Sequence, residues 1–177
     1  KCYCPCIVQT ATRFYAVDGD CMENAMQPEI ERRTTNMKEV NVIYWSSTGN
    51  TQAMAEAVGA GVEEAGGKAN VMEVSAADVS MLKDAESFAL GASAMGDEEL
   101  DAEMDDFVTA VEGICAGKTV GLFGSYDWGD GEWMRKWVDR MTAAGATVVN
   151  GEGVIANLTP DDDAVAACKA LGAALAK

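Results

Sequence analysis

From residue 37 onward the sequence alternates between short apolar runs and longer amphipathic patterns, and this alternation limits the possible folds. The apolar runs lie at 40–45, 69–74, 87–92, 119–125 and within 147–154, and the helical patterns lie at 50–65, 98–115, 131–144 and from 159 onward. Strands that alternate with helices are joined by right-handed crossovers into a parallel sheet. The sequence therefore predicts an α/β fold of three layers, in which helices cover both faces of a five-stranded parallel sheet.

Several local signals define these elements. Val40 to Trp45 is apolar almost throughout, as expected for a strand that is buried on both faces. Gly66 and Gly67 are expected to end the first helix. Thr159, Pro160 and Asp161 have the order of a helix cap, a first-turn proline and a first-turn acid, so they predict the start of the last helix.

Charge and composition exclude several classes of function. The chain has 13 basic and 29 acidic residues, and no histidine. The acidic excess disfavours binding to nucleic acid or to anionic membranes, because both kinds of binding require Lys and Arg. It favours basic protein partners, or it serves solubility alone. Without histidine, a Ser-His-Asp triad and a typical catalytic zinc site are excluded. No apolar stretch is as long as a membrane span, so a cytoplasmic protein is expected. No catalytic residues and no metal site are expected.

Residues 1–36 do not fit the pattern that follows them. They show no sustained strand or helix period and contain four of the six cysteines. Glu31, Arg32 and Arg33 can be encoded by a purine-rich ribosome-binding sequence that lies three codons before the Met37 codon. The hypothesis is that residues 1–36 are a non-domain extension, either translated leader or disordered, and that residues 37–177 form the domain. The alternative is a cysteine-rich arm that binds a metal or an iron–sulfur cluster.

The acidity and the remaining cysteines belong to the domain itself. Without residues 1–36, 9 basic and 24 acidic residues remain, a net charge of −15. Cys115 and Cys168 each lie alone inside helical patterns, which predicts small, buried apolar side chains.

Three unusual loops follow predicted strands, at the sheet edge where ligands of open α/β sheets bind. The first, WSSTGNT at 45–51, opens a helix and is rich in hydroxyl groups but contains no Lys or Arg. Unpaired N–H groups and the helix dipole could hold a phosphate there without a cationic side chain. A Walker A loop would need Gly-Lys-Ser/Thr, so nucleoside triphosphate chemistry is not expected. The alternative is an ordinary Ser/Thr-rich helix cap.

The other two loops could contact an aromatic ligand. In the loop at 93–98, Gly96 permits the positive φ of a type II′ turn, although a simple turn into an acidic helix would explain it equally well. The loop at 124–133, GSYDWGDGEW, places Tyr126 and Trp128 among glycines. A Trp on such a loop could cover a flat ligand, or it could be exposed or packed on its own loop.

The segments WSSTGNT, GASAMGDEEL and GLFGSYDWGDGEWM, in this order and spacing, resemble the short-chain flavodoxins, especially those of clostridia and related anaerobes. The resemblance extends from Met37 to Lys177, and residues 1–36 have no counterpart in the family. It implies a flavodoxin-like sheet with strand order 2-1-3-4-5 and a bound flavin mononucleotide (FMN).

The resemblance also implies which residues contact the FMN. The phosphate would be wrapped by Ser46, Ser47, Thr48, Gly49, Asn50 and Thr51, with a further contact from Ser93. Met95 and Trp128 would flank the isoalloxazine, and Gly96, Asp97 and Glu98 would line its N5 and N3 edge, with the Glu98 carboxylate accepting from N3–H. Tyr126, Asp127 and Gly129 would frame the pyrimidine side, and Ala94 and Ser125 complete the set. Asp127 departs from the family, in which glycine is frequent at this position.

The implied function is that of a low-potential one-electron carrier that shuttles between the semiquinone and the hydroquinone. A peptide flip at Gly96–Asp97 would offer a carbonyl to the protonated N5, and an acidic site would disfavour the anionic hydroquinone. The family suggests ferredoxin-type redox enzymes as partners, namely oxidoreductases, hydrogenase or nitrogenase, which would meet the acidic surface of a monomer.

Two alternatives are weaker. An FMN-dependent quinone or dye reductase would need room over the flavin, but Met95 and Trp128 are expected to cover both of its faces. A receiver domain of similar strand order would need carboxylates after the first and third strands, where this sequence has Trp45-Ser46 and Ala92-Ser93.

Overall fold

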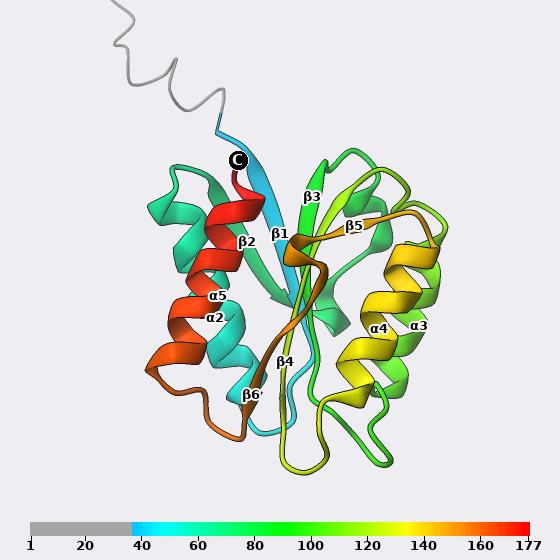
Figure 1. Cartoon of the computed structure of the whole chain (residues 1–177). Helices are drawn as coiled ribbons and strands as arrows, with labels where there is room; N and C mark the ends of the chain where they lie inside the picture. Colours follow the sequence, from blue (N-terminus) through cyan, green and yellow to red (C-terminus); the bar gives the residue numbers. More distant parts are fainter. Residues whose placement is uncertain (1–36) are drawn as a thin grey trace, which may run out of the picture. The chain divides into compact units, whose positions relative to one another are not determined.

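A parallel β-sheet forms the centre of residues 37–177, the part of the chain that this computed structural model describes (Figure 1). Its strands are β1 (Glu39–Tyr44), β2 (Lys68–Glu73), β3 (Ser87–Gly91), β4 (Thr119–Tyr126), β5 (Thr147–Val148) and β6 (Val154–Asn157). They lie in the order β2-β1-β3-β4-β5, which confirms the predicted order 2-1-3-4-5. The hypotheses for residues 1–36, a leader or disordered extension or a metal-binding arm, concern residues outside the described part.

The fifth position of the sheet holds two short strands instead of the single strand expected within 147–154. β5 pairs with the start of β4, and β6 pairs with its last four residues, Phe123 to Tyr126. A 3-10 turn, Val149–Gly151, separates the two, and Asn150 in it has a left-handed φ of 59°. This turn interrupts the strand, because a residue with positive φ cannot continue an extended ladder.

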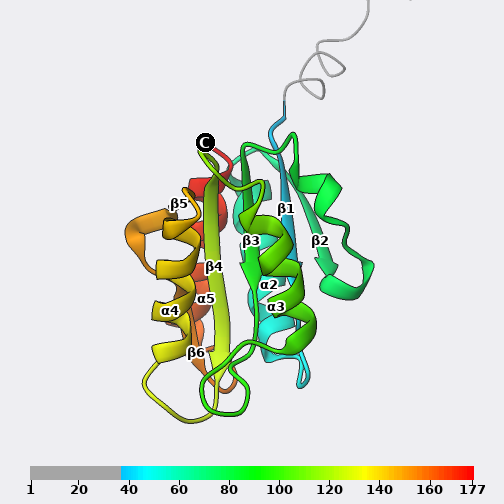
Figure 2. The same ribbon diagram turned by 90° about the vertical axis from the view of Figure 1, so that its right-hand side faces the viewer.

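Four α-helices cover the sheet, two on each face (Figures 1 and 2). They are α2 (Asn50–Glu64), α3 (Ala102–Glu112), α4 (Glu132–Ala143) and α5 (Asp162–Leu175). Helices α2 and α5 pack together on one face, and α3 and α4 cover the other. The connection from β2 to β3 contains two short 3-10 helices, Val74–Ala76 and Val79–Leu82. The three predicted layers are therefore present.

Two helices begin later than the sequence pattern predicted. The helix expected from Glu98 starts at Ala102, because Glu98 has a φ of 56° and Asp101 supplies the cap by accepting from the N–H of Glu103. The last helix starts at Asp162, and its cap is Asp161, which accepts from the N–H of Ala164 at 2.8 Å. Thr159 is therefore not the cap. In both cases an aspartate nearer the helix supplies the acceptor.

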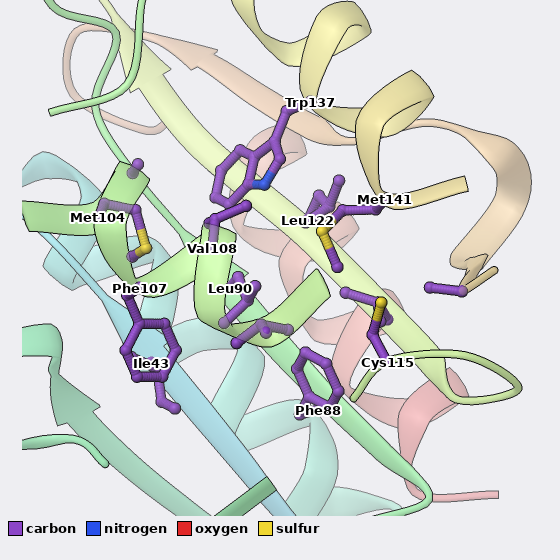
Figure 3. Packing of buried hydrophobic residues seen from close by; sticks show 14 of the residues in the cluster. Ile43, Phe88, Leu90, Met104, Phe107, Val108, Cys115, Leu122, Trp137 and Met141 are labelled. Atoms are coloured by element: carbon purple, nitrogen blue, oxygen red, sulfur yellow. The ribbon is translucent and has the colours of Figure 1, made fainter. Parts of the chain in front are cut away.

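Alternating strand residues divide the core into two clusters. Val40 and Val42 of β1 point toward the α2/α5 face, whereas Ile43 points toward the α3/α4 face. On the latter face, side chains of the strands meet Met104, Val108 and Trp137 of the two helices (Figure 3). Burial on both faces explains why these strands are apolar almost throughout.

The two described cysteines behave as predicted, since both are buried free thiols. Burial raises the pKa of Cys168 to about 12 and also raises that of Cys115, so both stay protonated at neutral pH. Among the described residues, no helix has the length and apolar character needed to cross a membrane.

Helices α2 and α5 approach so closely that glycine is required where they cross. A Cβ atom at Gly61 would collide with the backbone carbonyl of Lys169, and one at Gly172 would collide with that of Val58. A backbone obstacle cannot move aside as the end of a flexible side chain can.

We expect Gly61→Ala to lower the free energy of unfolding by about 1–3 kcal/mol, because the added methyl forces the two helices apart. Urea unfolding of the full chain measures this change. Gly113→Ala is the matched control, because a Cβ there meets only ordinary contact distances, so its unfolding free energy should stay within about 0.5 kcal/mol of the parent. Equal effects of the two substitutions would contradict the assigned close contact.

Candidate functional site

Three buried hydroxyl groups join the three loops predicted to form the site. Thr51 Oγ1, in the first turn of α2, lies 2.8 Å from Ser93 Oγ and 3.0 Å from Ser125 Oγ. Ser93 follows β3 and Ser125 lies near the end of β4, and all three side chains are buried. Parallel strands bring their carboxyl ends to one edge of the sheet, and these hydrogen bonds fix the three loops to one another there.

The start of α2 differs from the starts of the other three helices. Its N-cap is Gly49, which provides no side-chain acceptor, and its first turn contains no acidic residue. In contrast, α3 and α5 are capped by Asp101 and Asp161, and every other α-helix has an acid in its first turn. Within the described residues, the N–H groups of residues 50–52 donate no hydrogen bond. The positive end of α2 is therefore left open to an anion.

The loop before α2 surrounds this open helix start. Ser46 Oγ accepts from the N–H of Gly49 at 3.1 Å, which folds the loop back on itself. Ser47 and Thr48 are exposed, and Asn50 is half-buried. None of the ion pairs formed by the described residues involves this loop, so its attraction for anions comes from backbone dipoles and hydroxyl groups.

The second loop is a tight turn closed by Met95 and Glu99. Each donates its backbone N–H to the carbonyl oxygen of the other, at 2.9 Å in both directions. Gly96 has the positive φ expected from the sequence, 47°, and Asp97 is exposed at the tip. Glu98 also has a positive φ, which is uncommon for a residue with a side chain and was not anticipated. The turn projects the Met95 side chain outward, 38% exposed.

The Glu98 carboxylate is buried against the third loop. Its Oε1 atom accepts from the backbone N–H groups of Asp130, Gly131 and Glu132 at 3.1, 2.9 and 3.2 Å. Gly129 lies so close to this carboxylate that a Cβ at position 129 would collide with it. The expected partner of Glu98 was a ligand N–H, and its role as an acceptor for the start of α4 was missed.

Glu98, Asp130 and Glu132 also form a group of carboxylates whose oxygen atoms lie within 4.8 Å of one another. Glu98 already accepts three N–H groups, while Asp130 pairs with Arg135 and Glu132 pairs with Lys136. The protein itself therefore supplies the positive partners of all three carboxylates, and the group does not require a cation.

The third loop carries an exposed indole on a fixed base. Trp128 is 58% exposed, the highest value among the large apolar side chains that are exposed in the described part. The carbonyl oxygen of Tyr126 accepts from the N–H of Leu158 at 2.7 Å, and that of Asp127 accepts from Asn157 Nδ2 at 3.0 Å. Asp127 is not among the residues with a positive φ, so its backbone does not need the freedom of glycine.

The second and third loops lie against each other and leave a crevice of only about 20 Å³ between them. It is lined by Ala94, Gly96, Glu98, Asp127 and Trp128. All five are predicted contacts of the FMN, and the structure brings them together.

Comparisons with known proteins agree with this arrangement. A sequence model of the flavodoxin family matches residues 42–170. The chain belongs to the flavodoxin family. The flavodoxin of Clostridium beijerinckii is 41% identical over 124 residues, 70% of this chain and 89% of the relative. The flavodoxin of Megasphaera elsdenii is 42% identical over 139 residues, 78% of this chain and 98% of the relative.

A solved structure gives the same result for the fold. The solution structure of two-electron-reduced Megasphaera elsdenii flavodoxin superimposes with a TM-score of 0.69 at 41% identity, and the match covers 77% of this chain and 98% of that one. Flavodoxins bind FMN and are electron-transfer proteins rather than enzymes, so this chain is an FMN-binding electron carrier.

The described site fits FMN at its phosphate end. The N–H groups at the start of α2 have no acceptor, and the hydroxyl groups of Ser47 and Thr48 are exposed beside them. A dianionic phosphate needs several such donors, and no acidic residue in the first turn of α2 repels it.

We expect Asn50→Asp to affect stability and FMN binding in opposite directions. The added negative charge at the positive end of α2 should stabilise the flavin-free chain by about 0.3–1 kcal/mol. The same charge should weaken FMN binding by about tenfold or more, because it repels the phosphate. Urea unfolding and fluorescence titration with FMN measure the two effects.

Asn150→Asp is the matched control, because it adds the same charge in the turn after β5, far from the start of α2 (Figure 1). Its affinity for FMN should stay within about twofold of that of the parent, because charges separated by more than about 8 Å are largely screened from each other at physiological ionic strength. If Asn50→Asp binds FMN as tightly as the parent, α2 does not hold the phosphate.

Proposed function

We propose that this flavodoxin is a low-potential carrier that accepts and donates single electrons through FMN held by the three loops at the carboxyl end of the sheet. The bound flavin supplies two successive one-electron steps. The observation that carries the proposal is the open start of α2, joined through buried hydroxyl groups to the two loops predicted to hold the ring. Residues 37–177 are proposed as the FMN-binding domain, and the family match to residues 42–170 supports these bounds.

The phosphate is proposed to bind to the loop formed by Ser46, Ser47, Thr48, Gly49, Asn50 and Thr51, with Ser93 and Ser125 behind it. The N–H groups of residues 50–52 are free to donate, and Thr51 is fixed by its contacts with both serines. Because a helix start acts as a partial positive charge, a dianion can bind here although the domain is strongly acidic.

The ring is proposed to lie between the side chains of Met95 and Trp128. Both are exposed in the described structure, although large apolar side chains usually gain about 1.5–3 kcal/mol from burial. A flat ligand between them would cover both side chains and would keep water from its faces. Tyr126, Asp127 and Gly129 would frame the pyrimidine side. On this loop, the carbonyl oxygen of Tyr126 accepts from the N–H of Leu158, which follows β6, and that of Asp127 accepts from Asn157, the last residue of β6.

The turn at Gly96 and Asp97 is proposed to control the first electron step. The Met95–Glu99 pair fixes both ends of the turn, while Gly96 at its tip is free to change φ at little cost. The peptide between Gly96 and Asp97 can therefore rotate its carbonyl oxygen toward the N5 edge of the ring and accept a hydrogen bond from an N–H group there. One such hydrogen bond contributes about 0.5–1.5 kcal/mol.

The carboxylates near the ring are proposed to keep the second potential low. The segment 96–106 contains seven acidic residues, and Asp127, Asp130 and Glu132 lie in or next to the third loop. Added negative charge on the ring would be repelled by this surface.

The same acidic surface is proposed to recognise ferredoxin-type redox enzymes, whether oxidoreductases, hydrogenase or nitrogenase, through basic patches around their own redox centres. We propose that the carrier works as a monomer in the cytoplasm. The free thiols of Cys115 and Cys168 are consistent with a reducing compartment.

A redox titration of the FMN-loaded chain tests this proposal. We expect two resolved one-electron steps, with the second at much lower potential than the first, and no direct reduction by NADH. Gly96→Thr should reduce the separation of the two potentials by about 20–60 mV, because a β-branched residue resists the φ change that the turn requires.

Gly117→Thr is the matched control, because Gly117 also has a positive φ and open space around it, but lies in the turn before β4. This variant carries similar backbone strain and should leave both potentials unchanged. A single two-electron step in the parent would contradict the carrier function, and equal shifts in the two variants would contradict the role of Gly96.

A further inference from the structure

We propose that Asn157, the last residue of β6, is a positioning residue that fixes the third loop, so that the backbone N–H groups of Asp127 and Trp128 face the proposed site of the ring. The orientation of the loop follows from the structure of the chain alone. The consequence for the flavin rests on the proposed function, in which the ring lies beside this loop.

The interruption of the fifth strand brings Asn157 to this place. The 3-10 turn at Val149–Gly151 ends β5, and the chain then continues as β6, which lies beside the last four residues of β4 (Figure 1). In this register Asn157 is the partner of Tyr126, the residue at which β4 ends. The Asn157 side chain can therefore reach the backbone that follows β4.

Three hydrogen bonds join the end of β6 to that backbone. Asn157 Nδ2 donates to the carbonyl oxygens of Tyr126 and Asp127, at 3.3 and 3.0 Å. The N–H group of Leu158 donates to the carbonyl oxygen of Tyr126 at 2.7 Å. Two successive carbonyl groups are therefore both turned toward β6, by donors that come from two adjacent residues.

The backbone of Leu158 is strained, and burial of its side chain does not explain the strain. Its φ is 55°, which is uncommon for a residue with a bulky side chain. The side chain is 49% exposed, so this conformation gains little from burial of the leucine. What the conformation does provide is the short contact between the Leu158 N–H group and the third loop.

The direction of two further N–H groups follows from these contacts. The peptide bonds of residues 37–177 are all trans, and in a trans peptide the C=O group and the following N–H group point in opposite directions. With the carbonyls of Tyr126 and Asp127 turned toward β6, the N–H groups of Asp127 and Trp128 are turned away from it. Because β4 lies between β6 and β3, this direction leads to the loop that follows β3.

These two N–H groups are free to bind an acceptor on that side. Neither donates a hydrogen bond to any residue between 37 and 177. Asp127 and Trp128 also line the crevice between the second and third loops, together with Gly96. A carbonyl oxygen on the pyrimidine side of a ring bound there would meet two donors whose direction is already fixed, so that less ordering of the loop is needed on binding.

Two substitutions at Asn157 separate its hydrogen bonds from the rest of the side chain. Asn157→Leu keeps a side chain of similar size but removes the Nδ2 donor, whereas Asn157→Gln keeps an NH₂ donor on a longer side chain. Asn70→Leu is the matched control. Asn70 Nδ2 also donates to two oxygen atoms, those of Glu39 and Asn41, but these lie toward the amino ends of β1 and β2.

NMR relaxation of the backbone N–H groups in the flavin-free chain tests the orientation of the loop. In the parent, we expect order parameters of about 0.85 at Asp127 and Trp128, as in rigid backbone. In Asn157→Leu they should fall to about 0.6 or lower, because the two carbonyls lose the Asn157 donor, while Asn157→Gln and Asn70→Leu should keep the parental values. Parental values in Asn157→Leu, or low values in the parent, would overturn the role of Asn157.

Titration with FMN and with riboflavin, which has the same ring but no phosphate, tests the consequence for the ring. We expect Asn157→Leu to bind both ligands about tenfold more weakly than the parent, because the misdirected donors face the ring that both share. The ratio of the two affinities should therefore stay unchanged. Asn157→Gln and Asn70→Leu should bind both ligands within about threefold of the parent. Parental affinities in Asn157→Leu, or a loss for FMN alone, would contradict the inference.

The second midpoint potential provides a readout that a loss of stability alone would not change. The fully reduced ring carries added negative charge and is the stronger acceptor, so the loss of two aligned donors should weaken its binding by a further factor of about three to ten. For a one-electron step, this factor lowers the second potential of Asn157→Leu by about 28–59 mV. An unchanged second potential would contradict the contact with the ring. If the parent itself fails to bind FMN, the proposed function fails, and the relaxation experiment still decides the orientation of the loop.

Discussion

The contact on which the site depends is the triangle of buried hydroxyl groups formed by Thr51, Ser93 and Ser125. Each belongs to a different loop, and the loops meet only because a parallel sheet brings the carboxyl ends of its strands to one edge. With Thr51 held in this way, the first turn of α2 points its free N–H groups at a fixed place. A chain with a strong net negative charge can then bind an anion through local dipoles, without a cationic side chain.

A second polar contact joins the same loops at the other end of the site. Glu98 connects the turn at 95–99 with the third loop and with α4, as the hydroxyl triangle connects them with α2. Between these two contacts lies the narrow crevice lined by Gly96, Glu98 and Trp128. The loops are therefore held together by two polar contacts, while the side chains of Met95 and Trp128 remain exposed.

Local patterns predicted the strands, the helices and the parallel sheet, and the resemblance to short-chain flavodoxins implied the strand order that the structure shows. Apolar runs such as Val40 to Trp45 define strands that are buried on both faces, and three loops of unusual composition follow β1, β3 and β4. The two late helix starts were missed because competing caps, such as Thr159 and Asp161, lie within two residues of each other. The role of Glu98 was missed for a different reason: its partners, at positions 130–132, are distant in sequence, and no local pattern identifies them. The glycine at position 131, where a cap is expected, was the available signal.

The start of α2 is proposed to bind the phosphate of the cofactor through neutral donors, and the binding of riboflavin tests this most directly. Riboflavin has the same ring as FMN but no phosphate, so titration of the flavin-free chain with each ligand isolates the phosphate contribution. Several hydrogen bonds to a dianion predict that FMN binds at least about 100-fold more tightly than riboflavin. Equal affinities for the two flavins would contradict the account.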